Sequence, residues 1–182
     1  MFSTPFNKIS KRTEKKLTFS IAYLFLIASI VMLYLDKQLT NDIAPNGIIS
    51  FELANTLERS QEILDSWTPL AKVFAGIGLG FDFLYLLIYT LFIAIIIHKL
   101  NKKLWTKKAF YRIGELLIWS LLLTAILDAM ENICLIKLLT GNAQPHWASI
   151  AYHLASTKFL LLLLSLLYII VNTLLLLIKK RS

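Results

Sequence analysis

Four long apolar segments separated by polar stretches dominate the hydrophobic pattern of the chain. They span residues 17–35, 73–97, 113–139 and 148–178. Each of them reaches or approaches the roughly 20 apolar residues that a helix needs to cross about 30 Å of hydrocarbon. Strands of a membrane barrel would instead alternate over short segments. The pattern therefore predicts four transmembrane helices in a single membrane domain that covers residues 1–182.

The composition agrees with this hydrophobic pattern. Of the 182 residues, 57% are apolar and 16% are charged, and the mean hydropathy is +0.67. Soluble globular domains contain about 45–50% apolar and about 25% charged residues, and disordered chains contain still fewer apolar ones. The composition therefore excludes both classes and favours an all-α integral membrane protein.

The distribution of charge predicts an orientation in the membrane. Lysine and arginine gather before residue 17, between residues 98 and 112, and at the C-terminal end, whereas residues 36–72 contain six acidic and three basic side chains. Because basic residues stay on the cytoplasmic side, both termini are expected there, with the 36–72 and 140–147 loops outside. The expected location is the bacterial inner (cytoplasmic) membrane, with the endoplasmic reticulum as the alternative in a eukaryotic cell.

The net charge of +8 is explained mostly by this topology. Basic residues at the membrane surface attract anionic lipid head groups by about 1 kcal/mol each, so membrane lipids are the expected partners. No nucleic-acid partner is expected, and a homo-oligomer remains open.

The outer loop, residues 36–72, is too patterned for a simple linker. Ala44-Pro45-Asn46-Gly47 predicts a turn. Asn55 or Thr56 can then cap an amphipathic helix that runs to about Trp67. The expected architecture is a four-helix bundle with an extracytoplasmic amphipathic helix between helices one and two. This helix either closes the bundle end as a structural lid or controls access to a site beneath it.

Ionisable and amide side chains lie inside three of the four apolar segments. At a rise of about 1.5 Å per residue, they fall roughly 10–16 Å below the outer helix ends, although neighbouring helices run in opposite directions. A charge near the middle of a bilayer costs at least about 2.5–3.5 kcal/mol, so such groups should face inward and find partners. We therefore expect one binding cluster with two further side chains close to it. The cluster consists of Asp82, Asp128, Glu131, Asn132 and Lys158, and the neighbours are Tyr85 and His153.

The charges of this cluster do not balance, which leaves three interpretations open. Lys158 neutralises only one of the three acids, so the other carboxyl groups must be protonated, hydrated or bound to a cation. The preferred hypothesis is a membrane protein that binds a proton, a cation or a small ligand at this site. One alternative is an enzyme acting on a lipid or apolar substrate, with Asp128 or Glu131 as general acid or base and Lys158 holding an anionic group. The other is a structural polar zipper without a ligand.

Sequence motifs that identify a cofactor or a transition metal are missing. The chain has no H-E-x-x-H motif, no H-x₃-H motif, no cysteine pair and no glycine-rich phosphate loop. A hard cation on carboxylate oxygens suits the cluster better than zinc does. The sequence therefore names no cofactor and predicts no conventional metal site.

Four segments of the chain resemble a group of small, mainly bacterial four-helix membrane proteins that have no assigned activity. They are residues 50–67 (SFELANTLERSQEILDSW), residues 78–90 (GLGFDFLYLLIYT), residues 127–139 (LDAMENICLIKLL) and the pair Lys158-Phe159. The resemblance implies that the outer-loop helix and the acidic, amide and lysine side chains of the cluster belong together. It implies no particular reaction or ligand.

Overall fold

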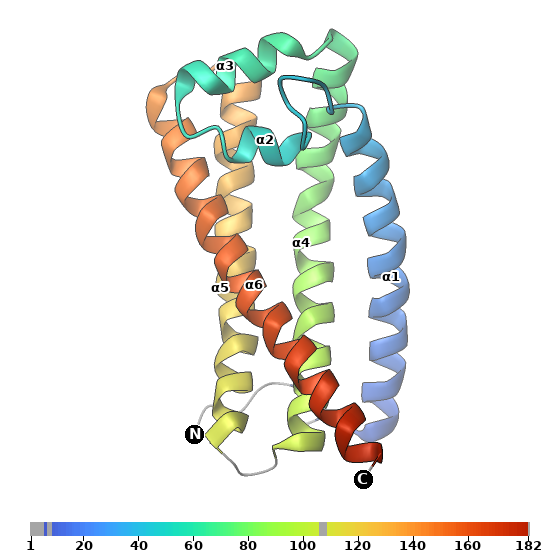
Figure 1. Cartoon of the computed structure of the whole chain (residues 1–182). Coiled ribbons are helices and arrows are strands. Elements are labelled where there is room, and N and C mark those ends of the chain that lie inside the picture. The colour runs from blue at the N-terminus through green and yellow to red at the C-terminus, as the bar shows by residue number, and fades with distance from the viewer. Residues whose placement is uncertain (1–5, 7–8, 106–108, 182) are drawn as a thin grey trace.

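The computed structural model describes residue 6, residues 9–105 and residues 109–181 of the chain. Within these ranges the regular structure is entirely helical, and four helices are long and apolar enough to cross a membrane. They are α1 (Lys11–Lys37), α4 (Pro69–Leu104), α5 (Ala109–Leu139) and α6 (Pro145–Arg181). Figure 1 shows them as one bundle, which confirms the all-α fold with four candidate transmembrane helices.

Two short helices cover one end of the bundle. They are α2 (Ile48–Glu52) and α3 (Leu57–Ser66), which lie between α1 and α4 in the sequence. Figure 1 shows both of them over the end at which α4 begins, whereas α1 begins and α6 ends at the opposite end. We call these the capped end and the terminal end.

The loop between α1 and α4 contains the turn and the helix that its sequence predicts. The Gly47 N–H donates to the Ala44 carbonyl over 3.0 Å, and Gly47 has a φ of +54°, which glycine adopts without strain. The hydroxyl of Thr56 accepts from the Arg59 N–H over 3.2 Å and caps the start of α3.

Helix α2, by contrast, is not predicted by the loop sequence. It has only five residues, and Asp36, which lies twelve positions earlier, caps it by accepting from the Ile48 N–H over 2.7 Å. A five-residue helix that depends on so distant a carboxylate leaves no periodic pattern of its own.

The long helices extend beyond most of the predicted apolar segments. Helix α4 begins four residues before the predicted span 73–97, because Thr68 caps it and Pro69 occupies its first turn. It continues to Leu104, seven residues past the predicted span, because lysine is a good helix former and Lys102 and Lys103 suit the negative end of the helix dipole. Helix α5 ends at Leu139, as predicted.

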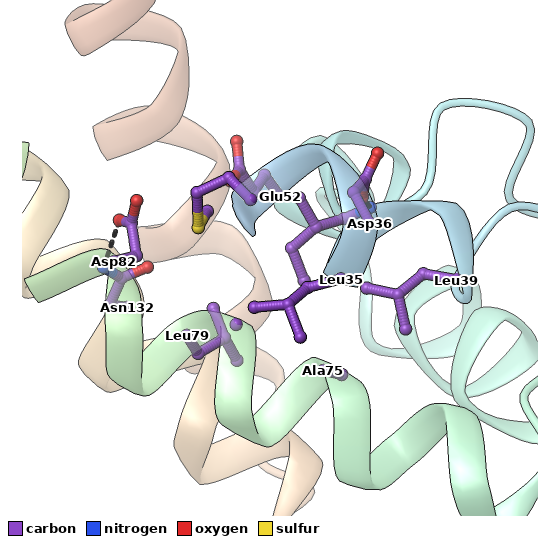
Figure 2. A pocket seen from close by; sticks show the side chains of 11 residues that line it. Leu35, Asp36, Leu39, Glu52, Ala75, Leu79, Asp82 and Asn132 are labelled. Atoms are coloured by element: carbon purple, nitrogen blue, oxygen red, sulfur yellow. Dashed lines mark hydrogen bonds between the residues drawn. The ribbon is translucent and has the colours of Figure 1, made fainter. Parts of the chain in front are cut away.

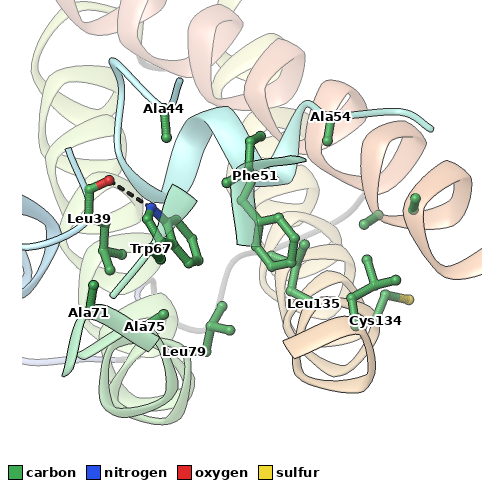
Figure 3. Packing of buried hydrophobic residues seen from close by; sticks show 14 residues of the cluster. Leu39, Ala44, Phe51, Ala54, Trp67, Ala71, Ala75, Leu79, Cys134 and Leu135 are labelled. Atoms are coloured by element: carbon green, nitrogen blue, oxygen red, sulfur yellow. Dashed lines mark hydrogen bonds between the residues drawn. The ribbon is translucent and has the colours of Figure 1, made fainter. Parts of the chain in front are cut away.

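Apolar side chains fix α2 and α3 onto the capped end, as Figure 3 shows. Phe51 and Trp67 are buried and meet edge to face, with 5.5 Å between ring centroids. The indole N–H of Trp67 donates to the Leu39 carbonyl over 2.8 Å. Leu135 of α5 and Ala151 of α6 belong to the same buried cluster. This packing brings the residue after Phe51, Glu52, against the long helices.

The outer surface of the bundle is apolar. Large apolar side chains stay exposed along the long helices, and the exposed fraction reaches 70% at Leu33 and 67% at Phe19. In water such a surface would be unstable, but hydrocarbon covers it without cost. The fold and its surface both identify a multi-pass membrane protein with charged groups inside.

Candidate functional site

Helix α5 supplies three of the site residues from one face. Asp128, Glu131 and Asn132 follow the spacing i, i+3, i+4, which places side chains on the same side of a helix. All three are buried, with exposed fractions of 2% or less. This face of α5 turns toward α4 and α6, so the sequence pattern correctly predicts which way these groups point.

Lys158 of α6 is the centre of the site. Its ammonium nitrogen lies 2.7 Å from Asp128 Oδ1, 2.9 Å from Glu131 Oε2 and 3.5 Å from Glu52 Oε2. The side chain is buried, and so are Ser165 and Asn172, which follow it at intervals of seven residues on α6. The lysine therefore contacts three carboxyl groups from two helices besides its own.

Helix α4 completes the site with a tyrosine and an aspartate. The Tyr89 hydroxyl donates to Asp128 Oδ2 over 2.6 Å. The Asn132 amide donates to Asp82 Oδ2 over 2.6 Å. Asp128 is thus held on both oxygens, by Lys158 and Tyr89, whereas the hydrogen-bond donor to Asp82 is a neutral amide.

Glu52 is a member of the site that the sequence analysis missed. It lies in the outer loop, residues 36–72, whose acidic side chains are expected outside the membrane. Only 8% of Glu52 is exposed. Burial raises the pKa of Glu52. The positive charge of nearby Lys158 opposes this rise, and the negative charge of Asp128 adds to it. Its position in the run Ile48-Ile49-Ser50-Phe51-Glu52-Leu53-Ala54, as the single acid among mainly apolar residues, is the signal that could have revealed it.

The side chains predicted to neighbour the site are placed differently from the expectation. Tyr85 forms a hydrogen bond of 3.1 Å with Ser29 and stacks on Phe25, so it faces α1 and touches the site only through the ring of Tyr89. His153 is exposed. It precedes Lys158 by five residues, which at 3.6 residues per turn and about 1.5 Å per residue points it about 140° away and places it about 7.5 Å nearer the start of α6.

We call Glu52, Asp82, Asp128, Glu131 and Lys158, together with Tyr89 and Asn132, the charged cluster. With every carboxyl group ionised, four negative charges would face one positive charge. Among the described residues, Glu52 Oε2 and both carboxyl oxygens of Glu131 are buried without a hydrogen-bond partner, although Lys158 lies within ion-pair distance of both side chains. Buried carboxylates in this situation require a proton or another positive charge.

A small pocket adjoins the charged cluster between α1 and α4, beneath α2. Its volume is about 30 Å³, which is enough for one or two water molecules. Figure 2 shows Asp82 and Asn132 at one end of the pocket and Leu39 at the other, with Glu52 between them. The charged cluster therefore borders a cavity, and Asp82, which belongs to both, is partly exposed.

Over the described ranges, no group of three or more histidine, cysteine, aspartate or glutamate side chains has the arrangement needed to hold a metal ion. Comparison of the chain with protein-family models, with curated proteins and with solved structures finds no match. The resemblance of residues 50–67 and the other segments to small bacterial membrane proteins therefore stays a prediction.

Proposed function

We propose that the charged cluster is an intramembrane binding site for a positive charge, either a proton or a small cation. The observation that carries this proposal is the excess of carboxyl groups around Lys158, with Asp82 paired only to the neutral amide of Asn132 among the described residues. A protein that needed only to join its helices would gain nothing from surplus buried acids, because each one adds a desolvation cost.

The contacts of Asp128 argue against this residue as the general base of the enzyme alternative. Both of its oxygens already accept hydrogen bonds, one from Lys158 and one from Tyr89. A general base needs a free oxygen within reach of the substrate proton. Asp82 and Glu52, which line the pocket, are the better placed groups for exchange with the surroundings.

Thermal unfolding of the purified protein in detergent tests the proposal. The measurement covers pH 5 to 9, with Na⁺, K⁺, Mg²⁺, Ca²⁺ or Zn²⁺ present or absent. A cation that binds only the folded state at a hundredfold excess over its dissociation constant stabilises it by about 2.7 kcal/mol. We expect stabilisation by protons, seen as a loss of stability with rising pH, or by one of the metal ions.

Two matched variants locate the response. Asp82→Asn removes a carboxylate that lines the pocket, and Asp65→Asn makes the same change at an exposed position of α3. We expect Asp82→Asn to lose most of the response and Asp65→Asn to keep it. A wild-type protein that responds neither to pH nor to any cation, or two variants that behave alike, would overturn the proposal and leave the polar zipper.

For the orientation, we propose that the terminal end is cytoplasmic and that α2 and α3 lie outside, in a bacterial inner membrane with lipids as partners. Basic side chains at the terminal end support this, including Lys11, Arg12 and Lys15 of α1 and Lys102 of α4. Residues 7–8 and 106–108, which carry further lysines of this pattern, lie outside the described residues. A cysteine replacing the exposed Gln61 should react with a membrane-impermeant thiol reagent added to intact cells, whereas one replacing Lys11 should not.

A further inference from the structure

The pocket next to the charged cluster combines two chemistries in one small space. Its polar lining consists of the carboxyl groups of Asp82, Glu52 and Asp36 and the amide of Asn132 (Figure 2). Asp36 already accepts a hydrogen bond from the Ile48 N–H, which leaves Asp82 and Glu52 as the carboxyl groups next to Lys158 and Asn132. Most of the remaining lining is apolar. Met32 and Leu35 come from α1, Ala75 and Leu79 come from α4, and Leu39 comes from the loop after α1. A ligand that matched this lining would be positively charged at one end and apolar beside it.

Glu52 shows that the carboxyl groups beside the pocket are only partly compensated. Its side chain is nine-tenths buried and lines the pocket, and within the described part of the chain its Oε2 accepts no hydrogen bond. The nearest cation, Lys158, is 3.5 Å away and is closer to two other carboxyl groups. An ammonium group in the pocket would give Asp82 a charged partner and would add a second positive charge near Glu52.

The position of the pocket indicates access from the membrane. Met32 and Leu35 lie in the predicted span 17–35, and Gly78 and Asp82 lie in the predicted span 73–97. Figure 1 shows that α6 runs beside α5 at the capped end and crosses toward α1 only at the terminal end. Met32, Gly78 and Asp82, which line the pocket below α2, are each partly exposed, so the pocket reaches the surface of the bundle within the predicted spans.

The volume limits what the pocket encloses. About 30 Å³ accommodates a group the size of one or two water molecules, such as a primary ammonium, but no long apolar chain. The apolar part of a ligand would have to extend past Met32 into the lipid. Asp82 is partly exposed, which allows a charged head group to reach it from that side.

We propose that this pocket binds the ammonium group of an amphiphilic amine that enters from the membrane, with Asp82 and Glu52 holding the charge. This inference rests on the proposed function, because it names the class of positively charged ligand that the surplus carboxyl groups take. Asn132 is a positioning residue here, since its amide orients the Asp82 carboxylate.

Dodecylamine is the probe that tests this assignment, with the protein in nanodiscs of a zwitterionic phospholipid. Dodecanol has the same chain without the charge, and methylamine has the charge without the chain. We expect dodecylamine to raise the unfolding temperature of the wild-type protein in a saturable manner, and the two control compounds to bind about tenfold more weakly or not at all.

Two glycine variants distinguish the pocket from the rest of the surface. A Cβ at Gly78 or at Gly80 would meet no atom within 4 Å, so a side chain can begin at either position without a clash. Only Gly78 lines the pocket, whereas Gly80 is exposed. Gly78→Leu should fill the pocket and weaken dodecylamine binding about tenfold, while Gly80→Leu should leave it unchanged. Asp82→Asn provides a second test that does not depend on how Gly78→Leu folds, and it should also weaken binding.

The outcomes separate this inference from the proposed function. If Gly78→Leu loses dodecylamine binding and keeps its response to pH, the result supports both the amine pocket and the proposed function. A response to pH or metal ions without saturable dodecylamine binding, or equal binding of methylamine and dodecylamine, overturns the amphiphilic amine and leaves the proposed function standing. Equal binding in Gly78→Leu and Gly80→Leu overturns the location. Absence of every response overturns both.

Discussion

The bundle joins its helices through two groups of buried polar side chains that differ in charge. Near the terminal end, Asn101 donates to the Tyr111 carbonyl over 2.8 Å and accepts from the Tyr168 hydroxyl over 3.0 Å, which ties α4, α5 and α6 together. The Trp105 indole donates to Asn172 in the same region. We call these residues the neutral network. Toward the capped end, the charged cluster joins the same three helices with four acids and one lysine.

This difference separates the buried polar contacts that helix packing requires from those that it does not require. Amides, hydroxyls and carbonyls satisfy one another in the neutral network and leave no net charge to compensate. The charged cluster spans the same helices at a higher cost, because its acids outnumber its single lysine. Helix packing alone does not require such an excess, so we ascribe the excess to function.

Removal of the lysine should break the charged cluster with the largest effect of any single substitution. Lys158→Met leaves Asp128 and Glu131 without their cation, and stranding a buried charge in this way costs about 3–5 kcal/mol. We expect the loss to be greatest at high pH and smaller at low pH, where the acids become neutral. Chemical unfolding in detergent at several pH values measures it.

The control for this variant lies two turns along the same helix. Ser165 is also buried, but its hydroxyl donates to the Leu161 carbonyl of its own helix over 2.9 Å. Ser165→Ala should cost about 1 kcal/mol or less at every pH. A Lys158→Met variant no less stable than Ser165→Ala would show that the ion pairs contribute nothing to the fold.

A substitution beside the neutral network should have a smaller effect that does not depend on pH. A Cβ at Gly114 would lie 2.6 Å from Asn101 Nδ2 and 2.9 Å from the Tyr168 hydroxyl, so both must shift. We expect Gly114→Ala to cost about 1–3 kcal/mol. Gly80→Ala, which meets no atom within 4 Å, should instead stabilise by up to about 1 kcal/mol. A pH-dependent loss in Gly114→Ala would contradict the separation of the two groups.

The smallest expected effect concerns Glu52 and is a change in pH dependence. Because burial raises its pKa in the folded protein, stability is lost as pH rises from the unfolded pKa through the folded one. Glu52→Gln removes this loss, so the variant should become progressively more stable relative to the wild type as the pH rises. The same substitution at the exposed Glu58 should leave the pH profile unchanged. Unfolding curves from pH 4 to 8 show whether the stability of Glu52→Gln relative to the wild type rises with pH or stays constant.

The sequence was sufficient to predict the features that depend on helical periodicity. The four spans, the stripe of Asp128, Glu131 and Asn132 on α5, and the common depth of Asp82 and Lys158 all follow from repeats along single helices. The structure brings these five residues together, because each helix turns its polar stripe inward to avoid the lipid.

The features that could not be predicted depend on contacts between distant segments. Glu52 joins the charged cluster only because α2 folds back over the bundle, which Asp36 and Phe51 secure. The rotation of α4 relative to α5 decides whether Tyr85 or Tyr89 reaches the charged cluster, and a sequence pattern does not fix this rotation. Tyr89 follows Asp82 by seven residues and stays within about 20° of its direction, whereas Tyr85 points about 60° away.

Infrared spectroscopy of the carboxyl groups tests the central claim most directly. The C=O band of protonated carboxylic acids is followed from pH 5 to 9 in wild-type protein and in Asp82→Asn, while circular dichroism reports whether the fold is intact. Our account predicts that in the wild type this band decreases with rising pH, or on addition of a bound cation, while the helices remain folded, and that Asp82→Asn diminishes the change. A band that stays constant until the protein unfolds would contradict it, because the proton would then be a fixed part of the structure.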